Sequence, residues 1–190
     1  MTHHFVNIIT WKYFCDKKLN NASIYVDGFI LKSVCLMFGL KAKKRSGLNF
    51  YHDVINDSSC FLLPRPLGGF TDFLVLPFWE EEKDIHIYKE LRDFIKDKSS
   101  IVIGISGPKQ DHLANLIEIE FPNKQIYCLG AAVTTSRLIS KEWLIITWPT
   151  MLYNDPIRTL LKLKASVWEM VDLVVSEKTK QDFKLFIKKI

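Results

Sequence analysis

The chain has 190 residues, of which 48% are hydrophobic and 13% aromatic, which excludes a disordered chain and suffices for one hydrophobic core. Its 26 Lys and Arg against 21 Asp and Glu give a net charge of +5, which permits an anionic partner without indicating one. No apolar run approaches the roughly 18 residues of a membrane-spanning helix, and the N-terminus lacks a signal-peptide pattern, so integral membrane and secreted proteins are not expected.

The cysteines and histidines predict neither a disulfide framework nor a metal site. The cysteines, which form no CxxC pair and have no histidine at zinc-finger spacing, are Cys15, Cys35, Cys60 and Cys128. We expect free thiols in a reducing compartment. Because the histidines are isolated or terminal, no metal site is expected. No cofactor is expected either. Nucleic acid is not an expected partner, because the basic residues lack interleaved aromatics on one element.

Apolar patterning predicts the elements of the first half of the chain. Residues 23–26 are a short strand, followed by an apolar helix over 29–38 that Gly39 ends. A second strand is predicted at 60–63, and a helix with one apolar face at 83–96.

The second half contains the clearest unit. Ile101–Ile105 is a continuous apolar strand of the kind found in parallel sheets, a helix follows over 111–121, and the next strand is 125–129. This strand–helix–strand order predicts an α/β fold, a Rossmann-like parallel sheet flanked by helices. From about residue 155 to the end, the pattern predicts helix.

We expect two parts: a Rossmann-like domain over residues 1–150 and a helical C-terminal segment over 151–190. In the C-terminal segment, lysines are interspersed among the apolar residues. It is either an ordinary amphipathic helix or a surface that binds an anionic membrane leaflet, at about 1 kcal/mol per basic residue near the membrane.

Two polar segments follow predicted strands, where open α/β sheets bind their ligands. The first contains Asp27. A carboxylate there can act as a general base, an effect of roughly 10²–10⁴ in rate, or it can cap the following helix. The second is the turn Gly107–Gln110.

That turn has the composition of a phosphate-binding site. Gly107 permits close approach of a ligand, and Pro108 suits the first position of a helix, whose N-terminus favours anions. Lys109 adds a positive charge, and the amide of Gln110 can both donate and accept. The turn is neither a Walker loop nor a dinucleotide fingerprint. Farther upstream, Arg45 ends a basic run that is either a diphosphate clamp or a solvated surface.

Five short segments follow one another along the chain: Tyr25–Gly28, Arg45–Gly47, Ile101–Asp111, Glu142–Leu144 and Asn154–Arg158. In this order, they resemble the WecG/TagA/CpsF family of bacterial glycosyltransferases. The resemblance extends over most of the chain, which would be a shortened member of the family. Asp111 stands where the family pattern has a glutamate.

The resemblance implies a fold of the family's own Rossmann-like class (GT-E-like) and an inverting hexosyltransferase. Such an enzyme moves N-acetylmannosamine or a related hexose from a UDP-sugar to a polyprenyl-diphosphate-linked saccharide. It takes part in capsule or other cell-surface polysaccharide synthesis, and it works as a peripheral protein at the cytoplasmic face of the membrane. A partner transferase or an oligomer is also compatible with the resemblance.

The resemblance also implies roles for individual residues. Asp27 stands at the position of the catalytic base. Arg45 matches an active-site arginine that helps to neutralise diphosphate charge, and Gln110 matches a residue of the donor pocket. Thr10 stands near the polar residue that follows the first strand, and Arg158 belongs to the matching C-terminal segment; both are assigned to substrate binding.

Two alternatives remain open at this point. One is a non-catalytic relative that acts as a partner or nucleotide-binding subunit of a polysaccharide assembly complex. The chain is shorter than the family between residues 69 and 83, and it lacks the arginine that follows the Glu-Trp pair in the family's C-terminal stretch. The other is a different phosphate-ligand enzyme on a similar sheet, such as a nucleotide-sugar hydrolase.

Overall fold

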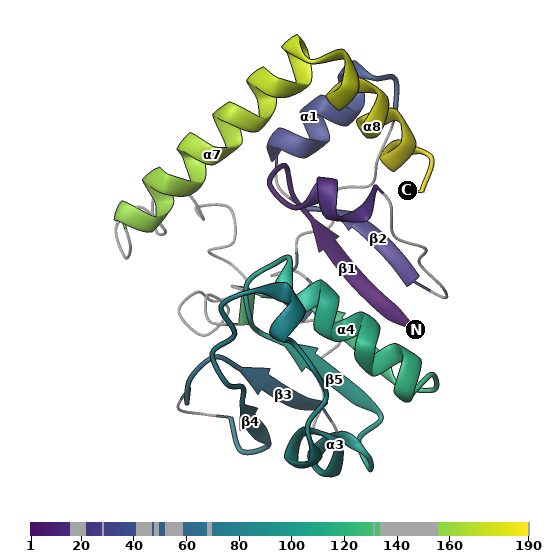
Figure 1. Ribbon diagram of the computed structural model, residues 1–190, viewed down its shortest axis with the longest axis vertical. Coiled ribbons are helices and arrows are strands. Elements are labelled where there is room, and N and C mark those ends of the chain that lie inside the picture. The colour runs from purple at the N-terminus through teal and green to yellow at the C-terminus, as the bar shows by residue number, and fades with distance from the viewer. Residues whose placement is uncertain are drawn as a thin grey trace. The chain divides into compact units, whose positions relative to one another are not determined.

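The chain forms an α/β structure around one parallel sheet. A computed structural model describes residues 1–15, 22–27, 29–40, 47, 50–51, 59–67, 70–130, 132–133 and 156–189. Within these residues, six parallel strands form one sheet in the order β2-β1-β6-β5-β3-β4 (Figure 1). The predicted class, a Rossmann-like parallel sheet flanked by helices, is confirmed at that level.

The strands are β1 (Thr2–Val6), β2 (Ala22–Val26), β3 (Ser59–Leu63), β4 (Phe73–Val75), β5 (Ser100–Ile103) and β6 (Gln125–Cys128). The helices are α1 (Phe29–Met37), α3 (Lys89–Ile95), α4 (Lys109–Glu120), α7 (Pro156–Val175) and α8 (Glu177–Ile187), with short 3-10 helices η1 (Trp11–Phe14) and η2 (Glu82–Asp84).

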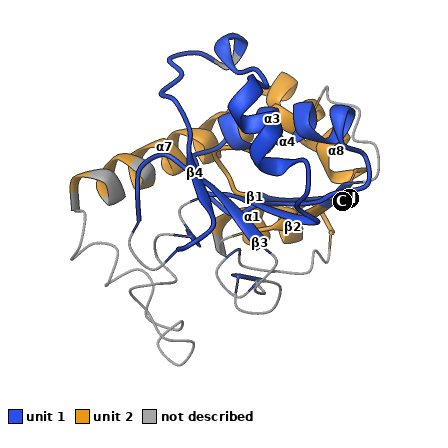
Figure 2. Cartoon of the chain, turned by 90° about the horizontal axis from the view of Figure 1, so that it is seen from below, with its two compact units in different colours: residues 1–5, 19–23, 47–138 blue, residues 6–18, 24–46, 139–190 orange. Residues whose placement is uncertain are grey.

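Two compact units make up the chain (Figure 2). Unit 1 comprises residues 1–5, 19–23 and 47–138, and unit 2 comprises residues 6–18, 24–46 and 139–190. The expected division at residue 150 stays a prediction.

Helices α3 and α4 cover one face of the sheet in unit 1 (Figure 2). Alternate strand residues point to opposite faces, so every second residue of the strands meets these helices. The core they form includes Leu62, Ile101, Ile103 and Ile126 of the sheet together with Leu91, Ile95, Leu113 and Ile117 of the helices, all fully buried. This apolar layer holds α4 against the strands.

Aromatic side chains pack on the other face. His3 of β1 stacks on Tyr127 of β6 with ring centroids 4.8 Å apart and 10° between the planes. Phe50 packs against both rings and lies edge-on to Phe5 at 5.0 Å. The first strand therefore contributes aromatic contacts to this face and other residues to the α4 face.

The structure differs from the sequence prediction in four places. The predicted helix over 83–96 begins only at Lys89, because Tyr88 has an extended backbone (φ −92°, ψ 167°) that a helix cannot include. Strands β1 and β4 have no counterpart among the predicted elements. The helical C-terminal segment is interrupted at Ser176, whose hydroxyl accepts the N–H of Thr179 at 3.2 Å and starts α8.

An aromatic cluster fills unit 2. Trp11 of η1 is fully buried and meets Phe183 of α8 edge-to-face, with centroids 4.9 Å apart. Phe186 and Phe38 pack against the same pair. Polar contacts add to this: Lys189 donates to the carbonyl of Phe14 at 2.7 Å. The C-terminal helix α8 is thus anchored on the short helix that follows β1.

Helix α7 forms ion pairs with Lys12 of η1 and exposes apolar side chains along its length. Nζ of Lys12 lies 3.0 Å from Oε2 of Glu169 and 2.9 Å from Oδ2 of Asp172. The exposed side chains include Ile157, Leu160, Leu161, Val167, Trp168, Val171, Val174 and Val175. Among the described residues, no helix is both long and apolar enough to cross a bilayer.

We expect Phe183→Ala to destabilise the protein by about 3–5 kcal/mol, because it removes a fully buried ring from the aromatic cluster. Leu185→Ala on the same helix is the control, since Leu185 is 49% exposed and its loss leaves no cavity. Urea unfolding followed by tryptophan fluorescence measures both. Equal effects of the two substitutions would contradict the packing of α8 on η1.

Candidate functional site

The predicted turn Gly107–Gln110 connects β5 to α4 and lies in unit 1. Pro108 is the residue before the helix (φ −83°) rather than its first residue, because α4 begins at Lys109. The N–H of Gln110 donates to the carbonyl of Ser106 at 3.3 Å, which closes the turn. Residues 107–110 therefore form one ordered corner at the carboxyl end of β5, where parallel sheets bind ligands.

The side chain of Gln110 carries the least satisfied polar group of this corner. Gln110 is 5% exposed, and its Oε1 has no hydrogen-bond partner among the residues that the structure describes. Buried amide oxygens are nearly always bonded, because leaving one unpaired costs about 1–3 kcal/mol. A ligand that presents a hydroxyl or N–H to this oxygen would remove that cost.

Gly130 holds the other side of the Gln110 amide. It has a left-handed backbone (φ +52°), and a Cβ built there would lie 3.1 Å from Oε1 of Gln110 and 3.2 Å from the carbonyl oxygen of Ile105. Glycine adopts this conformation without strain and leaves room for the amide. The position of Gln110 thus depends on a residue far along the chain, beyond helix α4 and strand β6.

Lys109 joins the corner to a neighbouring loop. Its ammonium donates to the carbonyl of Trp79 and lies 5.2 Å from the centre of the Phe78 ring. Phe78 is 88% exposed. The structure thus places the basic side chain of Lys109 at this turn, as expected. The same side chain connects the loop around residues 78–79 to the start of α4.

Asp27 and Thr10 belong to unit 2. Asp27 follows β2 directly, and its N–H donates to the carbonyl of Val6 at 2.8 Å, which fixes it beside the end of β1. Helix α1 begins at Phe29, so both predicted roles, general base and helix cap, stay open. Thr10 closes a turn: its hydroxyl accepts the N–H of Asn7 at 3.1 Å.

The other predicted residues are only partly described. Arg158 lies in the first turns of α7, and its side chain is outside the described set. Arg45 falls wholly outside the described residues. The structure thus groups Gly107, Pro108, Lys109 and Gln110 in unit 1 and places Asp27, Thr10 and Arg158 in unit 2.

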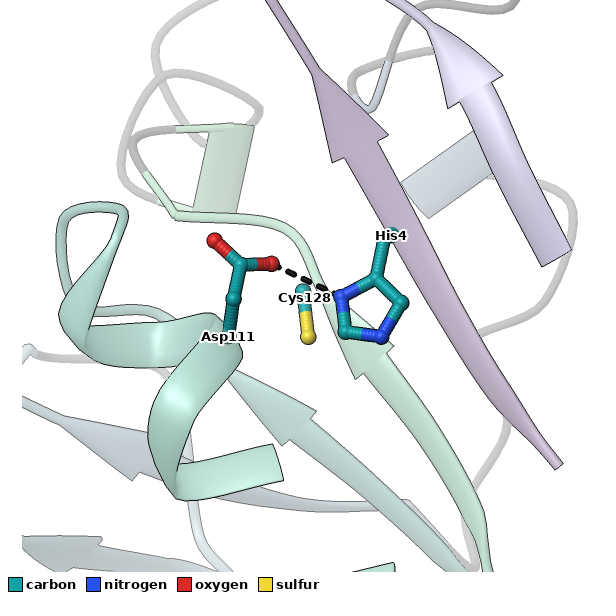
Figure 3. Close-up of side chains that lie close together, drawn as sticks. All are labelled: His4, Asp111 and Cys128. Atoms are coloured by element: carbon teal, nitrogen blue, oxygen red, sulfur yellow. Dashed lines mark hydrogen bonds and ion pairs between the residues drawn. The ribbon is translucent and has the colours of Figure 1, made fainter. Parts of the chain in front are cut away.

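A buried polar cluster that the sequence pattern does not predict lies beside the turn, in unit 1. It consists of His4 on β1, Cys128 at the end of β6 and Asp111 in the first turn of α4 (Figure 3). The register explains the first two, because His4 and Cys128 are direct neighbours in the parallel β1–β6 pair. Neighbouring strands are about 4.8 Å apart, so their side chains meet on the face that α4 covers.

The cluster is buried and contains an internal hydrogen bond. Nδ1 of His4 lies 2.8 Å from Oδ1 of Asp111, and the two side chains are 3% and 2% exposed. Burial raises the pKa of the Cys128 thiol well above its usual value, and the charge of Asp111, its hydrogen bond to the thiol and the charge of Glu118 raise it further. The thiol is therefore protonated at neutral pH and is not a nucleophile.

A sequence signal for this cluster exists, although it is weak. Asp111 shares the inward face of its helix with Ala114 and Ile117, so a carboxylate stands at an apolar position. His4 lies in β1, all five residues of which are buried, so a polar side chain occupies a position in a fully buried strand. What the sequence does not contain is the register that brings Cys128 beside His4.

No protein-family model, curated protein or solved structure matches the chain. Its function is therefore inferred from its own residues.

We expect Gly130→Ala to destabilise the protein by more than the roughly 1–2 kcal/mol that a left-handed residue costs, because the added Cβ also meets Gln110 and the Ile105 carbonyl. Gly39→Ala is the control, since Gly39 is also left-handed (φ +80°) but has nothing within 4 Å of the added carbon. Thermal unfolding compares the two. A smaller loss at Gly130 than at Gly39 would contradict the close contact with Gln110.

Proposed function

We propose that the chain is an inverting glycosyltransferase of the WecG/TagA/CpsF type, with the GT-E-like variant of the Rossmann-like fold. It transfers an N-acetylmannosamine-like or related hexose from a UDP-sugar to a polyprenyl-diphosphate-linked saccharide in cell-surface polysaccharide synthesis. The observation that carries the proposal is the buried, unpartnered Oε1 of Gln110 at the carboxyl end of β5, unpartnered among the residues that are described. The order of the motifs in the sequence supports it.

The corner at residues 107–110 suits a nucleotide-sugar donor. The start of α4 offers a positive dipole end to a diphosphate, and Gly107 allows the ligand to approach the backbone. The amide of Gln110 needs a donor for its oxygen, and both the imide of uracil and the hydroxyls of a sugar provide one. Lys109 adds positive charge at the same corner.

In the proposed reaction, Asp27 takes the proton of the acceptor hydroxyl as its oxygen attacks the anomeric carbon. The new glycosidic bond forms on the face opposite the UDP, the bond to UDP breaks, and the electron pair leaves with the diphosphate. The configuration is therefore inverted. Arg45 and Arg158 would neutralise diphosphate charge on the donor or acceptor.

A lipid-linked acceptor places the reaction at a membrane surface. The exposed apolar side chains of α7, among them Trp168 at 64% and Leu161 at 61% exposure, support a peripheral association with the cytoplasmic leaflet. The lysines of the two C-terminal helices would add attraction to anionic lipids.

We expect Gln110→Ala to weaken binding of UDP-N-acetylhexosamines by up to about tenfold, because it removes a hydrogen bond worth roughly 0.5–1.5 kcal/mol. Gln125→Ala is the matched control: Gln125 is exposed at the amino end of β6, away from the carboxyl ends of the strands. Isothermal titration calorimetry measures both variants and the wild type. If the folded wild type binds no UDP-sugar alone or with a lipid acceptor, the donor site is wrong and a non-catalytic partner becomes the better description.

We expect Asp27→Asn to lower transfer from UDP-sugar to a polyprenyl-diphosphate acceptor by about 10²–10⁴ while leaving donor binding unchanged, since the amide keeps the shape and cannot take the proton. Asp93→Asn, on the exposed surface of α3, is the control. Radiolabelled sugar incorporated into lipid is the measurement. Unchanged transfer would remove Asp27 from the mechanism, and free sugar released without lipid would indicate a hydrolase.

A further inference from the structure

The cluster of His4, Asp111 and Cys128 brings together three different metal-binding groups from three elements. Their ligand atoms, an imidazole nitrogen, a carboxylate oxygen and a sulfur, all lie within 4.8 Å of one another (Figure 3). All three residues are buried and belong to unit 1. None of the three is used in the proposed transfer reaction.

These donors match the chemistry of zinc. Zn²⁺ binds histidine nitrogen, carboxylate oxygen and thiolate at about 2.0–2.3 Å in a tetrahedral arrangement, so its ligand atoms lie about 3.3–3.8 Å apart. The His4–Asp111 pair at 2.8 Å is slightly closer than this, and the whole cluster spans no more than 4.8 Å. Small side-chain rotations would therefore bring the three donors to bonding distance.

The burial of His4, Asp111 and Cys128 is the second observation that points to a ligand set. Polar groups are costly to bury unless they are fully paired, and apolar residues of similar size would fill the same space beneath α4 at lower cost. Apolar side chains lie in the same layer: Ile103 and Ile126 are fully buried on the strands, and so is Ala114 on the helix. An imidazole, a carboxylate and a thiol at one point in such a layer have the composition of a ligand set.

We propose that Nδ1 of His4, the carboxylate of Asp111 and Sγ of Cys128 bind one divalent transition-metal ion of the zinc class. The ion replaces the proton shared by Nδ1 of His4 and Asp111, which moves to Nε2 of His4 or to solvent, and the thiol proton is released to solvent when the sulfur binds. Three protein ligands leave one tetrahedral position for a water or another small ligand. The ion would link β1 and β6 to the first turn of α4.

The test uses the full chain, purified under reducing conditions without chelator. Metal content measured by plasma mass spectrometry should approach one zinc per chain after dialysis against trace zinc. Cobalt(II), titrated into the metal-free protein, should give the near-ultraviolet absorption of a thiolate–cobalt bond together with the visible bands of a tetrahedral site. This spectrum reports sulfur ligation in the wild type and needs no substitution.

Substitutions then assign the site. Cys128→Ala should abolish the thiolate band and weaken cobalt binding by more than the roughly 10–100-fold that loss of an outer partner costs. Cys60→Ala is the matched control, because Cys60 is equally buried in the same core, on β3, and lies outside the cluster. Asp111→Asn, which keeps the side-chain shape, should weaken binding while circular dichroism stays unchanged.

Two results would overturn the proposal. One is a folded wild type that binds neither ion at micromolar concentration, which would make the cluster a hydrogen-bonded core feature. The other is a thiolate band that survives in Cys128→Ala. Neither result depends on UDP-sugar binding, so the metal site and the proposed function can fail separately.

Discussion

The parallel register between β1 and β6 is the constraint on which most of unit 1 depends. It pairs His3 with Tyr127 and His4 with Cys128. Because side chains alternate along a strand, the first pair belongs to the aromatic face and the second to the face under α4. A slip of one residue would exchange the two histidines between faces, which would remove the 4.8 Å ring stack and the 2.8 Å contact to Asp111 together.

Helix α4 couples this register to the candidate ligand corner. Its first turn contains two consecutive buried polar residues, Gln110 and Asp111, which are 5% and 2% exposed. Gln110 lies against Gly130, and Asp111 contacts His4. The apolar residues of the next turns, Leu113 and Ile117, hold the helix on the sheet. The start of α4 is therefore fixed from two sides, which limits how far the turn before it can move.

The sequence predicts this region unevenly, for physical reasons. The strand–helix–strand unit from β5 to β6 is readable because a continuous apolar run, a Gly-Pro turn and an amphipathic helix are all local signals. Strand β1 is not predicted, because it contains the polar side chains of His3 and His4. Their burial depends on contacts with Tyr127 and Asp111, which lie in the second half of the chain. For the same reason, local pattern predicts the turn at Gln110 but not its contact with Gly130.

The start of α3 shows the opposite error, in which local periodicity predicts too much helix. Residues 83–96 have a helical pattern, yet Ile85 is buried in the core ahead of a helix that begins only at Lys89. The segment between them runs through the extended Tyr88, so the burial of Ile85 is achieved by a loop rather than by a helical face. Here the packing of Ile85 in the core overrides the helical propensity of the segment.

Asp111 connects the sequence resemblance to the buried cluster. The family pattern has a glutamate after the Pro-Lys-Gln turn, and this chain has the shorter aspartate. Only 2% of the Asp111 side chain is exposed, and its carboxylate lies 2.8 Å from Nδ1 of His4. We therefore expect another methylene at position 111 to move the imidazole or the helix. Such overpacking typically costs about 1–3 kcal/mol. The contact with His4 therefore favours the shorter aspartate over glutamate at position 111.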